Sequence, residues 1–378
     1  MRRDNKGLFI AALMVAAVIF SFLTIYAFGE HKSGGFSVSA KSAVLYQPET
    51  DVFLYSKNAD TRLPMASTTK IMTALVALEN SSMDEVVKID NTAIGVEGSS
   101  AYLKQDDVLT MEELLYALLL QSANDAAVAI ACHIGGDVER FADMMNEKAL
   151  ALGLTDTHFV NPHGLDGEEH YTTAKELALI AAEALKNCEF RKIVSTYKKT
   201  FATEDRSRTY VNHNKLLRLY DGCVGIKTGF TKKSGRCLVG AAERDGLTFV
   251  TVTLDAPNDW NDHSVMMNYG YNKLERIAFA EPFDHVYKLP VLDGIKEYVT
   301  VANIEGASII AERDDRTVDE HIRLLRYAIA PIERGDILGE LIYTVEGETI
   351  ARIPLVATET VNKTEKQGLF DKILSIFD

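Results

Sequence analysis

Hydrophobic positions along the chain follow two different periods, which predict where strands and helices lie. Apolar and polar residues alternate over residues 36–58, which predicts two strands joined through residues 47–50. Helical spacing follows, and short apolar runs return after residue 222. We expect a loop at residues 161–167, helices over residues 67–80, 111–134, 141–152, 173–185 and 263–274, and strands over residues 223–228, 236–242 and 247–254. A polar stretch, residues 122–125, interrupts the second of these helical patterns.

The order of these elements predicts the fold class. A strand pair comes first, a helical block follows, and three strands with a final helix close the unit, which indicates an α+β domain over residues 36–277. After Pro282, short strand patterns alternate with turn residues such as Asp293-Gly294 and Glu346-Gly347. This change predicts a small all-β domain over residues 282–360, in which we find no catalytic cluster.

The N-terminus has the pattern of an export sequence. Arg2, Arg3 and Lys6 precede an uncharged apolar run over residues 8–28. As a helix this run would span about 32 Å, which is close to the thickness of a bilayer core. Residues 1–29 are therefore interpreted as a signal peptide, with cleavage after Gly29 favoured, or as a retained N-terminal anchor. Either reading places the rest of the chain outside the cytoplasm.

The C-terminus has the pattern of an amphipathic helix. Within residues 366–378 the apolar positions Leu369, Phe370, Ile373, Leu374 and Phe377 fall on one helical face. A short amphipathic helix at the end of a chain is typical of an interfacial membrane anchor. The alternative is a helix that docks on the body of the protein.

Composition narrows the classes of function. The 378 residues include 40 basic and 54 acidic side chains, so the formal charge is −14 and general nucleic-acid binding is disfavoured. Four cysteines are too few for a disulfide-built scaffold, and they show no zinc-binding spacing. A bridge between Cys223 and Cys237 is left open. We expect neither a metal nor a cofactor.

Three short motifs carry candidate chemistry, and their context matters more than their letters. They are Ser67-x-x-Lys70, Ser122-x-Asn124 and Lys227-Thr228-Gly229. Each triplet also occurs elsewhere, at Ser195/Lys198, at Ser56/Asn58, and at Lys32-Ser-Gly34 and Lys233-Ser-Gly235. Only the first set has the expected setting: a helix start, a polar break within helical sequence, and a strand.

These residue types suit nucleophilic catalysis by a serine. A spacing of three residues at a helix start puts Ser67 and Lys70 on one face. A serine hydroxyl needs a base, and Lys70 can serve as that base if burial or the charge of Lys227 destabilises its ammonium. Ser122 can relay a proton from either lysine to a leaving amine. Asn124 offers a donor and an acceptor to a peptide-like substrate.

The third motif suits substrate binding on a strand. Lys227 and Thr228 suit a carboxylate, and Gly229 lets a substrate backbone approach as an added strand. The backbone N–H groups of Ser67 and Phe230 would then form an oxyanion hole, which the positive end of the helix dipole assists.

With their flanks, these motifs resemble a known family. Residues 64–73 (PMASTTKIMT), 122–128 (SANDAAV), 159–165 (FVNPHGL) and 221–229 (DGCVGIKTG) are similar to the serine D-alanyl-D-alanine carboxypeptidases, the low-molecular-mass penicillin-binding proteins. The resemblance covers nearly the whole chain. It implies a β-lactamase/transpeptidase-like catalytic domain, followed by a small β domain and an amphipathic tail.

The resemblance also implies the reaction and its setting. Ser67 attacks the penultimate D-Ala carbonyl of a peptidoglycan stem pentapeptide, the terminal D-Ala leaves, and water hydrolyses the acyl-enzyme. β-Lactams would acylate Ser67 as slowly released inhibitors. The protein would act at the extracytoplasmic face of the bacterial membrane, held by its tail and in one reading also by its N-terminus.

One departure from the family and three rival readings remain. Some members carry an arginine after the Lys-Thr-Gly hairpin, whereas here residues 259–263 (DWNDH) occupy that stretch and no arginine lies between Arg244 and Arg276. Carboxylate binding would then rest on Lys227 and Thr228 alone or on another residue.

A β-lactamase would need a deacylating base, and no Glu-x-x-Leu-Asn pattern surrounds Glu168 and Glu169. The other rivals are a zinc peptidase using His158, His163 and His170, and a non-catalytic wall-binding or penicillin-sensing module.

Overall fold

The computed structural model describes residues 35–202, 207–313 and 317–364, which form two compact units that separate between Leu274 and Glu275. The predictions for residues 1–29 and 366–378 lie outside the described residues. Among the helices that the structure does describe, none is long and apolar enough to span a membrane.

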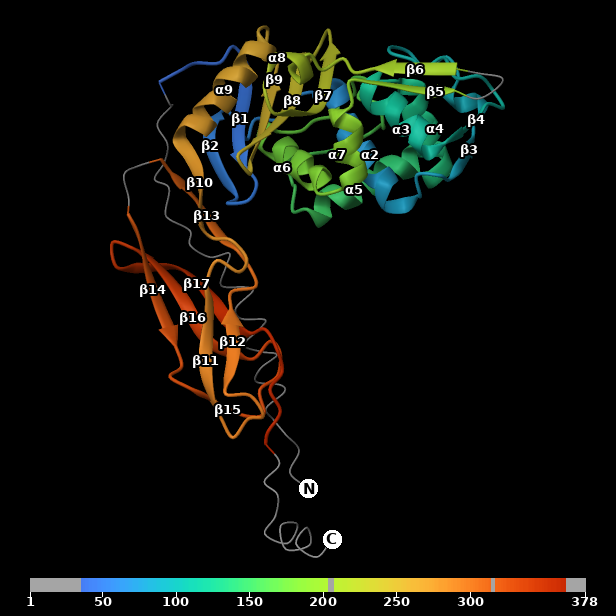
Figure 1. The fold of residues 1–378 in the computed structure, drawn as a ribbon. Helices are drawn as coiled ribbons and strands as arrows, with labels where there is room; N and C mark the ends of the chain where they lie inside the picture. The colour runs from blue at the N-terminus through green and yellow to red at the C-terminus, as the bar shows by residue number, and fades with distance from the viewer. Residues whose placement is uncertain (1–34, 203–206, 314–316, 365–378) are drawn as a thin grey trace, which may run out of the picture. The chain divides into compact units, whose positions relative to one another are not determined.

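The first unit is built on a five-stranded antiparallel sheet (Figure 1). Its strand order is β2 (Val52–Lys57), β1 (Ser42–Gln47), β9 (Leu247–Leu254), β8 (Gly235–Arg244) and β7 (Cys223–Thr231). The N-terminal strand pair therefore joins the three later strands through β1 and β9, which lie antiparallel. This arrangement leaves β7 at one edge of the sheet.

Both faces of the sheet are covered, because successive side chains of a strand point to opposite faces. On β8, Leu238 packs with Met267 of α9 (Asp259–Lys273) and with Leu216 of α8 (Leu216–Leu219). Its neighbour Val239 belongs to the larger core on the other face, which is shared with the helical block. Figure 1 shows α9 along one side of the sheet, with α6 and α7 on the other.

The helical block departs from the predicted elements where the chemistry lies. The stretch expected as one interrupted helical pattern over residues 111–134 forms two helices, α3 (Met111–Leu120) and α4 (Asn124–Gly135). Ser122, between them, has a positive φ of 62°, which a helix cannot accommodate. The first turn of the helix expected at residue 67 is a 3₁₀ turn, η1 (Ala66–Thr69), followed by α2 (Lys70–Asn80). The remaining helices of the block are α5 (Val138–Ala151), α6 (Ala174–Leu185) and α7 (Cys188–Ser195).

Several short elements escaped prediction because they are too brief to show a period. They are β3 (Val86–Lys88), η2 (Asn91–Ala93), β4 (Val108–Thr110), α7, β5 (Lys198–Ala202), β6 (Ser207–Val211) and α8. The strands form two small hairpins, β3 with β4 and β5 with β6. The final helix also begins at Asp259, earlier than the expected residue 263.

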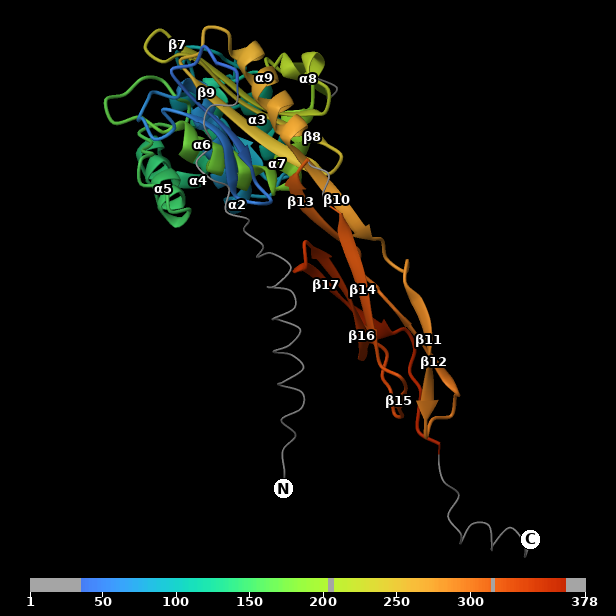
Figure 2. The same ribbon diagram turned by 90° about the vertical axis from the view of Figure 1, so that its left-hand side faces the viewer.

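The second unit consists of strands in its described part, as the sequence predicted. Its six-stranded sheet has the order β14-β16-β17-β12-β11-β15, and β10 pairs with β13 in a separate two-stranded sheet. Figure 2 shows β14, β16 and β17 side by side. Two of its strands, β14 and β15, are separated by residues 325–327. The bounds are β10 (Leu274–Ala280), β11 (Val286–Leu292), β12 (Tyr298–Ala302), β13 (Ala307–Glu312), β14 (Val318–Leu324), β15 (Ala328–Ile329), β16 (Ile337–Val345) and β17 (Glu348–Ala357).

Candidate active site

Ser67 lies in the η1 turn, directly before α2, and Lys70 is the first residue of α2. The Lys70 Nζ lies 3.1 Å from the Ser67 Oγ, as the spacing of three residues led us to expect. Ala66, which precedes Ser67, has a positive φ of 49°, a conformation that L-residues rarely adopt. The chain is therefore held in a tight turn at the candidate nucleophile.

Lys70 is fully buried, and its surroundings favour the neutral amine. Burial is the main cause that lowers the pKa of Lys70 well below its usual value, and the nearby charge of Lys227 lowers it further, while Asp125 acts in the opposite direction. The Nζ donates hydrogen bonds to Asn124 Oδ1 at 2.7 Å and to the carbonyl oxygen of His163 at 2.5 Å. A neutral amine has two N–H groups, so these two acceptors leave its lone pair for the Ser67 hydroxyl.

Ser122 and Lys227 form a second buried pair in this region. The Lys227 Nζ donates to Ser122 Oγ at 2.9 Å and to the carbonyl oxygen of Thr228 at 2.9 Å. Burial lowers the pKa of Lys227 to about 7. The positive φ of Ser122 ends the helical path of α3 and places this hydroxyl against β7. The two motifs, 105 residues apart, thus meet at one point.

Asn124 is engaged at both ends of its amide by the protein. Its side-chain oxygen accepts a hydrogen bond from Lys70, and its side-chain nitrogen donates one to the carbonyl oxygen of Glu97 at 2.5 Å. Its backbone N–H donates to the carbonyl oxygen of Ser99 at 2.7 Å. These contacts position the amine of Lys70 against Ser67. A direct contact of Asn124 with substrate stays a prediction.

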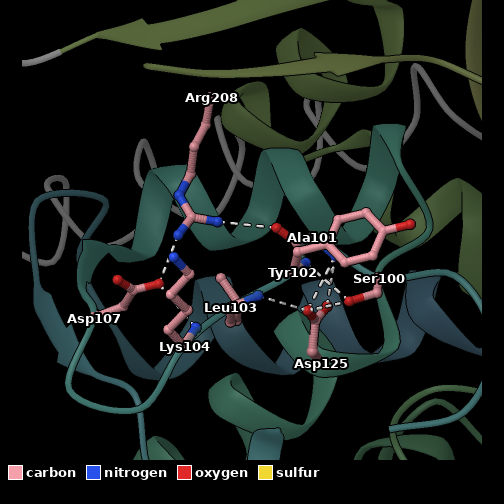
Figure 3. Close-up of polar contacts among 8 residues, drawn as sticks. All are labelled: Ser100, Ala101, Tyr102, Leu103, Lys104, Asp107, Asp125 and Arg208. Atoms are coloured by element: carbon pink, nitrogen blue, oxygen red, sulfur yellow. Dashed lines mark hydrogen bonds and ion pairs between the residues drawn. The ribbon is translucent and has the colours of Figure 1, made fainter. Parts of the chain in front are cut away.

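Asp125, the next residue, holds a loop beside the site (Figure 3). Its buried carboxylate accepts hydrogen bonds from Ser100 Oγ at 2.6 Å and from the backbone N–H groups of Ala101 and Leu103, at 2.9 and 3.1 Å. These bonds hold residues 100–103 against the start of α4, where Asn124 contacts Lys70. The sequence did not indicate this role of Asp125, because most of its partners are backbone N–H groups of a loop more than 20 residues away.

Arg208 ties the β5–β6 hairpin to the same loop. Its guanidinium donates to the carbonyl oxygen of Ala101 at 2.9 Å and pairs with Asp107 at 2.6 Å (Figure 3). The loop is thus bonded from both sides, by Arg208 and by Asp125. The side chain of Tyr102 between them remains 81% exposed.

The third motif lies on the edge strand β7, close to the candidate nucleophile. A Cβ at Gly229 would lie 3.1 Å from the Ser67 nitrogen and 3.1 Å from the Met65 carbonyl oxygen. A side chain here would crowd the serine turn, so glycine favours the close approach of β7, a reason that the sequence did not reveal. Phe230 is 66% exposed, and Thr228 is half-buried.

The loop at residues 161–167 contributes to the site in a way that sequence reasoning missed. Besides the His163 carbonyl oxygen that accepts from Lys70, the Pro162 carbonyl oxygen accepts from Thr73 Oγ1 at 2.6 Å. Asp166 accepts from Thr231 Oγ1 of β7 at 2.9 Å. The segment 159–165 carried the family resemblance, but backbone carbonyls leave no sequence pattern of their own.

The histidines and cysteines raised by the rival readings have other surroundings. The ring of His158 contacts the carbonyl oxygen of Glu169, and the ring of His170 contacts Thr69 and the Val160 N–H. Cys223 and Cys237 are free, since Cys223 is paired in register with Ala242 and Cys237 with Gly229. The bridge that the sequence left open is therefore absent.

The site as a whole is that of a serine acyl-transfer enzyme, and comparison with known proteins agrees. A family model described as D-alanyl-D-alanine carboxypeptidase matches residues 28–258, and one described as penicillin-binding protein 5, C-terminal domain, matches residues 282–363. The chain belongs to the D-alanyl-D-alanine carboxypeptidase family.

Individual relatives agree over most of the chain. It is 33% identical to D-alanyl-D-alanine carboxypeptidase DacF of Bacillus subtilis (strain 168), covering 86% of each protein. Penicillin binding protein 5 from Haemophilus influenzae matches with a TM-score of 0.63 and 26% identity, over 88% of this chain and 100% of that one. The Streptomyces K15 DD-transpeptidase matches with a TM-score of 0.60 and 35% identity, over 64% of this chain and 99% of that one. The expected α+β fold with a C-terminal β domain is thereby confirmed.

Proposed function

We propose that this protein is a serine D-alanyl-D-alanine carboxypeptidase that removes the terminal D-Ala from peptidoglycan stem pentapeptides. The observation that carries the proposal is the buried Lys70 amine, 3.1 Å from the Ser67 hydroxyl and bonded to two carbonyl-type acceptors. A wall-binding module would have no need of a buried amine in that position.

Acylation begins with transfer of the Ser67 proton. Neutral Lys70 accepts the proton from Oγ, and Oγ bonds to the penultimate D-Ala carbonyl carbon. The carbonyl oxygen becomes negatively charged and would be stabilised by the backbone N–H groups of Ser67 and of Phe230, the residue after Gly229, where β7 approaches the serine turn.

Breakdown of the tetrahedral intermediate needs a proton for the leaving amine. Ser122 donates its hydroxyl proton to the nitrogen of the terminal D-Ala as the C–N bond breaks, and the proton that Lys70 took from Ser67 replaces it, directly or through Lys227, which contacts Ser122. Lys70 is then neutral again. It takes a proton from the water that attacks the acyl carbonyl carbon and passes that proton to Ser67 Oγ as the ester C–O bond breaks. The products are free D-Ala and the shortened stem peptide, and Ser67 is regenerated.

Lys227 and Thr228 are the residues to which we assign binding of the substrate carboxylate. The stem-peptide backbone would add to the free edge of β7 beside Gly229 and Phe230, since β7 ends the sheet. Asn124 borders this site through its contact with Lys70. A β-lactam carries a carboxylate and a reactive carbonyl in an arrangement similar to that of the stem peptide, so we expect it to acylate Ser67.

The most direct test uses labelled penicillin and a stem-pentapeptide mimic with the purified exported chain. We expect covalent labelling and release of D-Ala, and loss of both in Ser67→Ala, because that variant lacks the nucleophilic oxygen. Ser195→Ala is the matched control, since Ser195 belongs to the other Ser-x-x-Lys triplet and lies at the exposed end of α7. Labelling that persists in Ser67→Ala would refute the nucleophile assignment, and labelling without D-Ala release would favour a sensor.

Arg236 is the residue we propose in place of the missing family arginine. It lies on β8 directly opposite Phe230, and the alternation of strands puts it on the same face as Thr228. Its guanidinium is held by Asp259 through Nε and Nη2 at 2.8–3.1 Å, beside the Trp260 ring, yet the side chain is 43% exposed. Asp259 and Trp260, which lie where some family members carry the arginine, thus hold in place Arg236, an arginine from strand β8.

Replacing Arg236 with Gln is expected to raise KM for the pentapeptide about 10-fold with a smaller change in kcat, because one charge-assisted bond to the carboxylate is lost. Steady-state kinetics with the pentapeptide and with its C-terminal amide check this. The variant should lose preference for the acid over the amide. An unchanged preference would show that Lys227 and Thr228 suffice. Arg62→Gln, which removes an exposed arginine paired with Asp156, is the control.

We further propose that the protein works outside the cytoplasm, tethered by residues 366–378. The support is the charged and apolar pattern of the two ends of the chain. Deletion of residues 368–378 is expected to release the signal-cleaved protein from the membrane fraction, because the apolar face of the tail is removed. Fractionation of cells checks this, and full retention of the truncated chain would assign the anchor to residues 1–29 instead.

A further inference from the structure

Three buried residues beside the nucleophile form a hydrogen-bonded chain that the mechanism above does not use. His170 Nε2 lies 2.8 Å from Thr69 Oγ1, and Thr69 Oγ1 donates to the carbonyl oxygen of Ala66 at 2.8 Å. All three residues are at most 3% exposed. Ala66 directly precedes Ser67, so this chain ends on the peptide group that carries the Ser67 N–H.

The direction of the chain is fixed by the backbone. The N–H of Val160 donates to His170 Nδ1 at 3.1 Å, so Nδ1 is the acceptor and the ring proton of the neutral imidazole lies on Nε2. Nε2–H therefore donates to Thr69 Oγ1, and the threonine hydroxyl is left to donate to Ala66. Burial lowers the pKa of His170 to about 4, which is consistent with a neutral ring.

The carbonyl of Ala66 is also fixed by packing. A Cβ at Gly164 would lie 2.0 Å from the Ala66 oxygen, so Gly164 of the 161–167 loop packs directly against this carbonyl. The positive φ of Ala66 is unfavourable for an L-residue, and the surrounding contacts must hold it. Thr69 supplies the hydrogen bond and Gly164 supplies the space.

Fixing this carbonyl also fixes the nitrogen of Ser67. In a trans peptide the C=O and the next N–H point in opposite directions. The Ala66 oxygen faces Gly164 and Thr69, whereas the Ser67 nitrogen faces Gly229 on β7, where a Cβ would lie 3.1 Å away. The N–H of Ser67 is therefore aimed toward β7, the strand that carries Phe230.

We infer that His170 and Thr69 are positioning residues that aim the Ser67 N–H at the substrate carbonyl oxygen by holding the Ala66 carbonyl on the opposite side. This inference rests on the proposed function, because it assigns the oxyanion donor of that same site. Neither side chain contacts substrate. Loss of the Thr69 hydroxyl lets the strained Ala66–Ser67 peptide rotate, which weakens the hydrogen bond that forms as negative charge develops.

The test compares two variants that differ by one hydroxyl. Thr69→Val keeps the shape of the side chain and removes the donor, whereas Thr69→Ser keeps the donor. We expect Thr69→Val to lower kcat for D-Ala release about 10- to 100-fold with little change in KM, since removing a whole oxyanion donor costs about 100- to 1,000-fold. Thr69→Ser should retain most of the activity. His170→Leu and His170→Gln form a second pair, in which the glutamine amide can still donate to Thr69.

A substrate change separates positioning from loss of structure. The enzyme should hydrolyse an ester analogue of the stem peptide faster than its thionoester, because sulfur is a poor hydrogen-bond acceptor in an oxyanion hole. In Thr69→Val this preference should fall toward one, and in Thr69→Ser it should persist. His263→Leu is the matched control, because His263 is also buried and contacts two threonine hydroxyls, of Thr251 and Thr253, between β9 and α9.

The outcomes distinguish the inference from the function on which it rests. If the unaltered protein releases no D-Ala, the proposed function fails. If it does, and Thr69→Val matches Thr69→Ser in kcat and in ester preference, the inference is overturned while the function stands. The same holds if His263→Leu lowers the preference as much as Thr69→Val. Should Thr69→Val fail to fold, His170→Leu against His170→Gln decides on the same two readouts.

Discussion

The burial of the Lys70 amine is the constraint on which the rest of the site depends. An ammonium removed from water loses a large hydration free energy, so the neutral form is favoured unless an anion pairs with it. Here the direct contacts of the Nζ are an amide oxygen, a backbone carbonyl oxygen and the Ser67 hydroxyl. The second lysine, Lys227, adds like-charge repulsion. The fold thus makes a base at neutral pH out of a residue that is ordinarily an acid.

This requirement explains why distant segments meet at one point. The two oxygen atoms that accept hydrogen bonds from Lys70 come from the start of α4 and from the 161–167 loop. Hydrogen bonds of Asp125 hold the start of α4. Hydrogen bonds from Thr73 and Thr231 hold the 161–167 loop. The same loop supplies Gly164 to the Ala66 carbonyl. The 161–167 loop therefore contacts both the base and the peptide group that carries the oxyanion donor, so a change in this loop would alter both.

Much of the fold followed from the sequence, because periodicity is strong where elements are long and half-buried. The strands and helices around the three motifs, and the change to an all-β unit after Pro282, were visible in this way. The polar break at residues 122–125 was also visible, although the positive φ of Ser122 was not. What escaped were features that depend on contacts between distant backbones: the hydrogen bond from Lys70 to the His163 carbonyl oxygen and the close approach of Gly229 to the serine turn. The sequence suggested a substrate role for Asn124, which stays a prediction, but it did not reveal that the Asn124 amide contacts Lys70 and Glu97. From the sequence, His170 was interpreted as a histidine that stabilises a loop, and only its buried contact with Thr69 indicates a role beside the nucleophile.

The protonation of Lys70 is the quantity that tests this account most directly. It can be followed by NMR of the full exported chain labelled with ¹³C at lysine Cε, with the resonance assigned from Lys70→Arg. An ordinary lysine titrates near pH 10.4. The account predicts that Lys70 titrates well below that value and is largely neutral at the working pH. A Lys70 that remains charged up to about pH 10 would contradict it, since such a residue could not accept the proton of Ser67.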